Sequence, residues 1–279
     1  MKTITRESYA KRIERVSEYL IDHLDTEINL HRLAEEANLS AYHFHRIYHG
    51  MVGETIKETV KRMRLHRAAV QLISTRLAIV TVATQAGYST IQAFNRAFSQ
   101  AYLMPPARYR ELQSRMASNP RTLSLEERRL FTVTIKQVEP LRVVALRHCG
   151  DYMQLGNAFE RLAIWAASLG INAATTASYG IYYDDPAGVP MELLRSDACI
   201  AVPASVTPIA PYRAIESPGG RCAVLVCKGP YSSLEKPYKW LFGEWLPQSG
   251  EEPADLPSFE QYLNDARTTQ PSELLTAIC

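Results

Sequence analysis

Long apolar segments are missing from this sequence of 279 residues. No apolar run approaches the roughly 18 residues that a membrane span requires, and the N-terminal stretch MKTITRESYAKRIERV has charges but no apolar core of the kind found in signal peptides. Cysteine is scarce as well: the five cysteines all follow residue 148, and no two have the spacing of a metal knuckle or a CxxC motif. We therefore expect a cytoplasmic chain without a membrane segment, whose cysteines are buried free thiols.

Neither a disordered chain nor a single minimal domain fits the composition. Apolar residues make up 46% and charged residues 22%, which is typical of a folded chain, and 279 residues suit two domains of ordinary size. The net charge of +2 hides an uneven distribution, because residues 1–115 hold 17 Lys/Arg and 11 Asp/Glu whereas residues 116–279 hold 14 and 18. This asymmetry predicts that the N-terminal part binds a polyanion and that the C-terminal part has another role.

The N-terminal part contains two similar segments with a helical pattern. AEEANLSAYHFHRIY (34–48) aligns with ATQAGYSTIQAFNRAF (83–98), and a one-residue insertion after the serine raises the offset from 49 to 50. The matching residues are Ala34 with Ala83, Ala37 with Ala86, Ser40 with Ser89, Phe44 with Phe94, Arg46 with Arg96, and Tyr48 with Phe98. Asn38 and Gly87 suit the left-handed backbone of a tight turn, and Ser40 and Ser89 suit the N-caps of the helices that follow. Each segment therefore predicts a helix-turn-helix unit.

Apolar stripes at helical spacing precede and join these two units. The stripes consist of Ile13, Val16, Leu20 and Leu24 before the first unit, and of Ile56, Val60, Met63, Val70 and Ile73 between the two. The joining helix also carries several basic residues. Two helix-turn-helix units joined by a basic helix predict DNA binding, because the second helix of such a unit enters the major groove and reads base edges.

At these residues the sequence resembles the DNA-binding domain of the AraC/XylS family of transcription regulators. The family's signature lies in the second unit and its tail, VATQAGYSTIQAFNRAFSQAYLMPPARYR (82–110), and we place the domain at residues 1–112. The resemblance implies that the two recognition helices read successive major grooves of double-stranded DNA, with base-reading candidates Ala41, Tyr42, His45, Arg46, Ile91, Gln92, Asn95 and Arg96. Tyr42 and His45 depart from the Trp and Gln of many relatives, and Leu103 replaces a glycine that is usual before the tail.

Some of these basic residues also have a structural interpretation. Arg46 and Arg96 could be solvated surface charges, but their equivalent places in the two units favour contact with DNA, since Arg paired with guanine is the commonest specific contact. Lys57, Lys61 and Arg62 could contact phosphates or form a solvated helix face, and the sequence leaves both interpretations open.

Three histidines lie on the first predicted recognition helix: His43, His45 and His49. They have no carboxylate or cysteine partner at ligand spacing, so we expect no metal site there and prefer His45 as a contact to DNA.

A polar, proline-containing stretch without sustained periodicity, residues 113–130, predicts a linker. After it the chain repeats at an offset of 79. The matches are Gly150 with Gly229, Tyr152 with Tyr231, Leu155 with Leu234, Phe159 with Tyr238, Leu162 with Leu241, Ala166 with Trp245, and Tyr183 with Tyr262. Each half reads strand, helix, strand, strand. The predicted fold class is therefore two domains: an all-α tandem helix-turn-helix domain, followed over 131–279 by an α+β domain of two such repeats, with antiparallel strands and helices on one face.

Residues 131–279 resemble the GyrI-like effector-binding domain, which occurs alone and joined to helix-turn-helix modules in Rob-type regulators. The resemblance rests on two GxYxxL helix starts, on WLFGEWLP (240–247) and on PSFEQYL (257–263). It implies a cleft between the two halves of the domain that binds small, often cationic and lipophilic molecules. It also implies that Glu260 occupies the acidic position of that cleft.

The chemistry of such a cleft can be read from residue types. Strand alternation puts Glu260 and Tyr262 on one face, and a carboxylate beside aromatic rings suits a bulky organic cation. The candidate walls, each of which could equally be ordinary core, are Tyr152, Tyr182, Trp240 and Trp245. The offset of 79 makes Ile181 the counterpart of Glu260, so strand pairing does not itself demand an acid. The alternative for Glu260 is an exposed charge on an ordinary strand.

Together these features predict a transcription regulator, with activation as the expected direction, that binds double-stranded DNA and a small-molecule effector and acts on RNA polymerase. We expect no cofactor, no metal and no enzymatic activity. Two alternatives for the second domain are a hydrolase, in which Glu260 acts as general base toward water and Tyr262 orients it, and a protein-interaction module. No Ser-His-Asp set strengthens the hydrolase.

Overall fold

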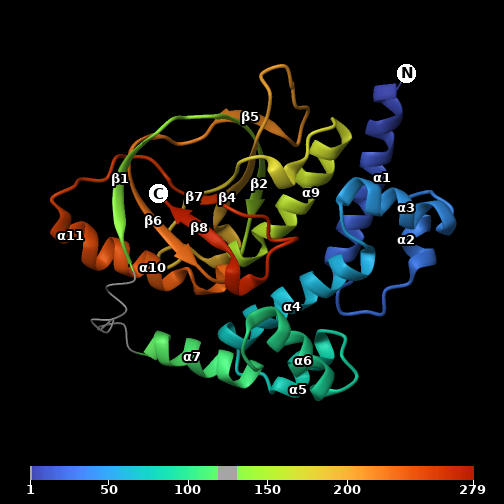
Figure 1. The fold of residues 1–279 in the computed structure, drawn as a ribbon, viewed down its shortest axis with the longest axis horizontal. Helices are drawn as coiled ribbons and strands as arrows, with labels where there is room; N and C mark the ends of the chain where they lie inside the picture. The colour runs from blue at the N-terminus through green and yellow to red at the C-terminus, as the bar shows by residue number, and fades with distance from the viewer. Residues whose placement is uncertain (1, 119–130) are drawn as a thin grey trace. The chain divides into compact units, whose positions relative to one another are not determined.

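The computed structural model describes residues 2–118 and 131–279, and these fall into two compact units (Figure 1). The first unit comprises the residues up to Ser114 together with Glu160–Ala173, and the second comprises the other described residues. The division falls inside helix α9 (Leu155–Ser168), after Phe159. Among the described residues, no helix is both long and apolar enough to cross a membrane.

The chain is helical before residue 119. Its helices are α1 (Lys2–Asp22), α2 (Leu30–Glu36), α3 (Ala41–Val52), α4 (Ile56–Ser74), α5 (Ile79–Gln85), α6 (Ile91–Tyr102) and α7 (Pro106–Ser118). Helices α2 and α3 form the first predicted pair, α5 and α6 form the second, and α4 joins them. Each pair has its own apolar core, which contains Phe44 and Tyr48 in the first and Phe94 and Phe98 in the second. These aromatic residues are the ones that the internal alignment matches.

Both predicted turns have the expected left-handed backbone. Asn38 has φ 49° and Gly87 has φ 79°. In each turn the backbone N–H of the third residue after the helix donates to the carbonyl of an alanine, Ala34 in one turn (2.8 Å) and Ala83 in the other (3.0 Å). A side chain at position 87 would also meet the guanidinium of Arg64, which donates to the carbonyls of Leu24 and Thr26. The positive φ and this close approach therefore both favour glycine.

Side-chain caps begin the helices that follow these turns. The Ser40 hydroxyl accepts from the backbone N–H of His43 at the start of α3, as predicted. At the start of α6 the capping residue is Thr90, whose hydroxyl accepts from Ala93 N at 3.2 Å, and the prediction of Ser89 is wrong by one residue. The one-residue insertion in the second unit moves the first helical turn, so the neighbouring hydroxyl takes the capping position.

Helix α7 extends into the segment predicted as a linker. It runs to Ser118, and residues 113–118 are therefore helical, while residues 119–130 of the predicted linker lie outside the described residues. The helical part, QSRMAS, contains Gln, Arg, Met and Ala, which are strong helix formers even without an apolar stripe.

The second unit is built on an eight-stranded antiparallel sheet. The strands are β1 (Val133–Val138), β2 (Arg142–Cys149), β3 (Ser178–Tyr182), β4 (Arg195–Ala201), β5 (Arg213–Glu216), β6 (Gly220–Lys228), β7 (Ser258–Tyr262) and β8 (Leu275–Ile278). Their order across the sheet is β1-β6-β8-β7-β3-β4-β2-β5. Helix α9 follows β2, and α10 (Glu235–Trp240), a π-helical stretch (Leu241–Trp245) and α11 (Leu246–Ser249) follow β6. Short 3₁₀ turns lie at Tyr152–Gln154, Ala173–Thr175, Met191–Leu193, Tyr231–Ser233 and Pro271–Glu273.

Strands β3 and β7 pair at the centre of the sheet with a reciprocal register. Ser178 pairs with Tyr262, Gly180 with Glu260, and Tyr182 with Ser258. Because side chains alternate along a strand, Glu260, Tyr262 and Tyr182 lie on one face of the sheet. The other face at this point carries the buried cluster of Val143, Ala145, Tyr179, Ile181, Cys199 and Phe259.

Candidate functional site

The first recognition helix, α3, turns its predicted base-reading residues outward. Ala41, His45 and Arg46 are exposed, while Phe44 is buried in the core of the pair. The side chain of Tyr42, also predicted to read bases, lies outside the described side chains.

Helix α6 repeats this arrangement in the second pair. Ile91, Gln92 and Arg96 are exposed, Asn95 is half-buried, and Phe94 is fully buried beneath them. Arg can pair with guanine, and Gln or Asn with adenine, through two hydrogen bonds in the major groove. Each of these two helices therefore presents an arginine at the equivalent exposed position.

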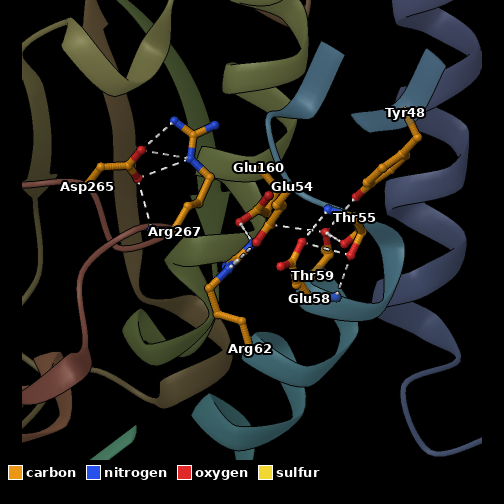
Figure 2. A network of polar contacts seen from close by, with 9 residues as sticks. All are labelled: Tyr48, Glu54, Thr55, Glu58, Thr59, Arg62, Glu160, Asp265 and Arg267. Carbon is orange, nitrogen blue, oxygen red and sulfur yellow. Dashed lines mark hydrogen bonds and ion pairs between the residues drawn. The ribbon is translucent and has the colours of Figure 1, made fainter. Parts of the chain in front are cut away.

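The arginines of α4 have a different role, because they turn inward. Arg62 forms ion pairs with Glu54 and with Glu160, at 2.8 Å from the latter (Figure 2). Arg64 donates to the backbone carbonyl of Leu24 at 2.9 Å, and Arg67 donates to that of Gln85 at 2.9 Å. Neither of the two interpretations considered for Arg62, phosphate contact or a solvated face, therefore holds for it.

The lysines of α4 differ from its arginines. Lys57 and Lys61 are both exposed, so either interpretation, phosphate contact or solvated face, suits them. The difference is chemical, because a guanidinium can satisfy several buried carbonyl or carboxylate groups at once and a lysine ammonium is more strongly hydrated.

The second candidate site surrounds Glu260 on β7. Glu260 is only 4% exposed. The alternative interpretation, in which Glu260 is an exposed charge on an ordinary strand, is therefore wrong. The hydroxyl of Tyr182 donates to Oε2 of Glu260 at 3.0 Å, and the Tyr182 and Tyr262 hydroxyls lie 2.8 Å apart. Glu260, Tyr182 and Tyr262 therefore form one hydrogen-bonded chain across the central strand pair.

Further aromatic rings enclose this chain. Tyr152 lies edge-on to Tyr182 with ring centroids 4.9 Å apart, and Tyr231 lies edge-on to Tyr262 at 5.3 Å. Phe159 of α9 meets the Tyr262 ring at 5.3 Å and 88°. The sequence pointed to Tyr152 and Tyr182 as walls but not to Tyr231 or Phe159, although Tyr231 is the repeat partner of Tyr152 and that match was the available signal.

Desolvation controls the protonation of this site. Burial raises the pKa of Glu260 to about 7, and the neighbouring hydroxyls of Tyr182, Tyr262 and Tyr238 oppose that shift only in part. No Lys, Arg or His among the described residues contributes to the pKa of this carboxyl. Its charge is therefore uncompensated whenever the proton leaves.

Buried hydroxyls without partners lie on the same face of the sheet. Thr276 and Ser196 are fully buried, and within the described chain neither hydroxyl has a hydrogen-bond partner. Thr276 pairs in register with Tyr262, and Ser196 pairs with Tyr182, so the two orphan hydroxyls flank the tyrosine pair. Such groups carry a desolvation cost that a bonding partner would remove.

Trp240 and Trp245, the other two predicted walls, are placed elsewhere in the second unit. Both pack against the cluster of Leu225, Cys227, Leu234, Leu241 and Ile278, and the Trp240 ring faces Phe131 at 5.2 Å. No described contact joins either indole to Glu260. Tyr238, which the sequence matched with Phe159 but did not assign to the site, is the α10 residue whose hydroxyl affects the pKa of Glu260.

A second buried carboxylate, on the opposite face of the sheet, shows the contrast. Asp197 is fully buried, and it accepts from Arg147 Nε at 2.7 Å, from Arg213 Nη2 at 2.8 Å and from the Tyr183 hydroxyl at 2.7 Å. Two guanidinium groups therefore compensate Asp197, whereas none compensates Glu260. Of these two acids, Glu260 is the one without a cationic partner among the described residues.

The register of the sheet corrects the internal alignment. Leu146 of β2 pairs with Ala198 of β4, and Leu225 of β6, which is 79 residues after Leu146, pairs with Ile278 of β8. Ile278 lies 80 residues after Ala198, so the offset between β4 and β8 is 80, whereas the matched glycines 150 and 229 have an offset of 79. One additional residue between α10 and β7 accounts for the change. Tyr182, not Tyr183, lies on the same face of the sheet as Tyr262, and Gly180, not Ile181, pairs with Glu260.

Comparison with known protein families and curated proteins gives a consistent result. The GyrI-like small molecule binding domain matches residues 131–279, and a helix-turn-helix domain matches residues 33–112. The chain is 28% identical over 120 residues to the HTH-type transcriptional regulator YbfP of Bacillus subtilis, which covers 43% of this chain and 41% of that protein. It is 32% identical over 142 residues to a DNA gyrase inhibitor of Edwardsiella piscicida, which covers 49% of this chain and 90% of the inhibitor.

Among solved structures, the chain is similar to a protein in the cryo-EM structure of an EcmrR–DNA complex. The sequence identity is 14% and the TM-score is 0.48, over 89% of this chain and 97% of that one.

Proposed function

The chain belongs to the family of the GyrI-like small molecule binding domain, which here follows an AraC-type helix-turn-helix domain, and from that premise we propose a transcription activator controlled by a small, lipophilic cation. The N-terminal domain reads double-stranded DNA, the C-terminal domain binds the effector, and the outcome is activation through RNA polymerase. The observation that carries the effector half is Glu260, a buried carboxylate among tyrosines with no cationic group contributing to its pKa.

The DNA half is supported by the matching exposed faces of α3 and α6. Arg46 and Arg96 occupy equivalent exposed positions, each two residues beyond a buried phenylalanine, so each helix is held by its core while its arginine is presented outward. We assign base reading to Ala41, Tyr42, His45, Arg46, Ile91, Gln92, Asn95 and Arg96. One chain then occupies two major grooves without dimerising.

Selection from random duplexes tests the DNA half. The wild type is expected to recover one site, and Arg46→Ala and Arg96→Ala are each expected to lose about 1–3 kcal/mol and to relax specificity at one base position. Lys11→Ala, an exposed residue of α1, is the matched control, because it removes one positive charge away from the recognition helices. Recovery of the same site at unchanged affinity by both arginine variants would contradict the assignment.

The effector half follows from the chemistry of the tyrosine-lined carboxylate. Aromatic rings attract a cation through their faces, and a carboxylate in a water-excluded site neutralises it. Because Glu260 is covered by its own hydrogen-bonded tyrosines, a ligand has to replace the Tyr182 hydroxyl as the carboxylate's partner. A lipophilic cation can do this, since its apolar surface replaces the contacts between rings.

Thermal unfolding of the full chain with tetraphenylphosphonium, and with neutral triphenylphosphine oxide as its control, tests the effector half. At about 100 times its dissociation constant, the cation should stabilise the folded chain by roughly 2.7 kcal/mol. The effect is expected to disappear in Glu260→Gln. No shift with either compound would favour a protein partner instead, and hydrolysis of an activated ester by the wild type but not by Glu260→Gln would favour the hydrolase.

We also infer that the second domain consists of two strand-helix-strand-strand repeats, β2-α9-β3-β4 and β6-α10-β7-β8. The reciprocal pairing of β3 with β7 supports this arrangement, as does the order of the strands on either side of them. The effector site then lies where the two repeats meet.

A further inference from the structure

We propose that helix α9 transmits the state of the Glu260 site to the DNA-binding helices, and that the ion pair between Glu160 and Arg62 is the contact through which it acts. The inference rests on the proposed function, because it assigns the regulatory link between the two activities. Its starting point is the division of α9, whose residues up to Phe159 belong to the second unit and whose residues from Glu160 belong to the first.

At its N-terminal end, α9 takes part in the effector site. The ring of Phe159 contacts the ring of Tyr262, the Tyr262 hydroxyl contacts that of Tyr182, and Tyr182 donates to Glu260. Each of these contacts is direct, so a ligand that displaces the Tyr182 hydroxyl from Glu260 changes the surroundings of Tyr262. Phe159 is the residue through which this change reaches α9.

The next turns of α9 belong to the first unit's own framework. Glu160 is 8% exposed and pairs with Arg62 at 2.8 Å, as Figure 2 shows. Arg161 forms ion pairs with Glu14 and with a second acid of α1, both at 3.3 Å, and Ile164 is buried in the same apolar core as α1–α3. A rotation or shift of this segment therefore changes polar and apolar contacts of the first unit together.

The charges around Arg62 make its contact with Glu160 suited to switching. Two carboxylates, Glu54 and Glu160, share one guanidinium, and each is about 10% exposed as a side chain. If Glu160 withdraws, Arg62 keeps Glu54, which is further held by the Thr59 hydroxyl at 3.0 Å. Arg62 and Glu54 then still form an ion pair without net charge, so α4 is not left with an unpaired buried charge. Breaking the contact with Glu160 therefore leaves α4 folded.

Helix α4 is the element whose position matters for DNA. It joins the two helix pairs, and two arginines of the same helix bind backbone carbonyls outside it: Arg64 binds that of Leu24, between α1 and α2, and Arg67 binds that of Gln85, at the end of α5. A change at Arg62 is therefore applied to the helix that sets the separation of α3 and α6. That separation decides whether both recognition helices reach successive grooves of one duplex.

Hydrogen exchange of the full-length chain tests this link without needing an operator or an effector. Tyr262→Leu removes the ring that Phe159 contacts, and Phe259→Leu is its control, because it removes a buried ring from the other face of the same strand. Each substitution is made in the wild type and in Glu160→Gln. We expect Tyr262→Leu to accelerate exchange of the α4 amides near Arg62 by about threefold or more in the wild type and not in Glu160→Gln.

The outcomes separate this inference from the proposed function. Equal acceleration in both backgrounds, or the same acceleration from Phe259→Leu, would overturn the role of α9, as would no acceleration at all. If Tyr262→Leu does not fold, Phe159→Leu removes the same ring contact from the helix side and is judged by the same comparison. If exchange of the α4 amides accelerates as expected but the chain selects no duplex, the role of α9 stands and the proposed function is wrong. If the chain binds a duplex and the cation but α4 exchange does not accelerate, the proposed function stands and the role of α9 is wrong.

Discussion

Gly180 pairs directly with Glu260 across the two central strands, and the space that a side chain at position 180 would fill is occupied by tyrosine hydroxyls. An ideal Cβ there would lie 2.6 Å from the hydroxyl oxygen of Tyr262 and 2.9 Å from that of Tyr182. The absence of a side chain on one strand thus permits the hydrogen-bonded chain that reaches the carboxylate on the other.

Gly180→Ala should therefore disturb the site and the stability of the second domain together. The added methyl group forces the two hydroxyls apart, and we expect a loss of about 1–3 kcal/mol in the free energy of unfolding, measured by urea denaturation. Gly156→Ala in α9 is the control, because a Cβ there meets nothing within 4 Å and alanine favours a helix. A Gly180→Ala chain as stable as Gly156→Ala would show that the tyrosines rearrange freely.

Stability should depend on pH through Glu260. Burial raises its pKa from 4.5 to about 7, so between these values the folded chain holds a proton that the unfolded chain has released. The free energy of unfolding of the wild type therefore falls as pH rises through this window and levels off above it. Glu260→Gln stays neutral, so its free energy of unfolding should exceed that of the wild type by an amount that grows with pH. The difference should rise from near zero at about pH 4.5 to roughly 3 kcal/mol at about pH 8. A difference that is constant with pH would contradict this.

Cation affinity should rise with pH over the same range. Below about pH 7 the carboxyl of Glu260 has to release its proton before it can neutralise a ligand, so the affinity for tetraphenylphosphonium should increase up to about tenfold per pH unit and then level off. Calorimetry in two buffers of different ionisation enthalpy would detect the released proton. Binding of neutral triphenylphosphine oxide should release none, and equal proton release by both compounds would exclude Glu260 as its source.

Thr276→Val should stabilise the unliganded chain. The Thr276 hydroxyl is fully buried and has no partner among the described residues, so an isosteric methyl group removes a desolvation cost of about 1–3 kcal/mol. Thr59→Val is the opposite case, because the Thr59 hydroxyl donates to Glu54 and contacts Tyr48, and its loss should destabilise the chain. Thermal unfolding measures both changes. If Thr276→Val is destabilised instead, the Thr276 hydroxyl is hydrogen-bonded to a bound water.

Local patterns were sufficient for most of the helical region. Turns at Asn38 and Gly87, and the buried aromatics of α3 and α6, follow from periodicity and from residue types that tolerate a left-handed backbone. The direction of the α4 arginines does not follow from such patterns. Arg62 pairs with Glu54, which precedes α4, and with Glu160, which lies 98 positions further along the chain, and no periodicity of α4 contains that information.

The Glu260 site shows how one residue of register limits sequence analysis. Residue types and family resemblance pointed to Glu260, Tyr262 and Tyr182, which the structure brings together. The alignment, however, matched Tyr262 with Tyr183, whose hydroxyl instead bonds Asp197 on the opposite face of the sheet. A shift of one residue moves a side chain to the other face, so the contacts of the site could not be derived until the strand pairing was known.

The reciprocal register of β3 and β7 also limits the negative charge at the proposed effector site. Residues paired across two strands lie about 4.5–5.5 Å apart, so an acid at both central positions would place two charges in mutual repulsion. With glycine on one strand and glutamate on the other, the junction has a single negative charge. Saturation should therefore occur at one monovalent cation per polypeptide, with a hyperbolic isotherm, even though the strands around the site are arranged in two similar halves.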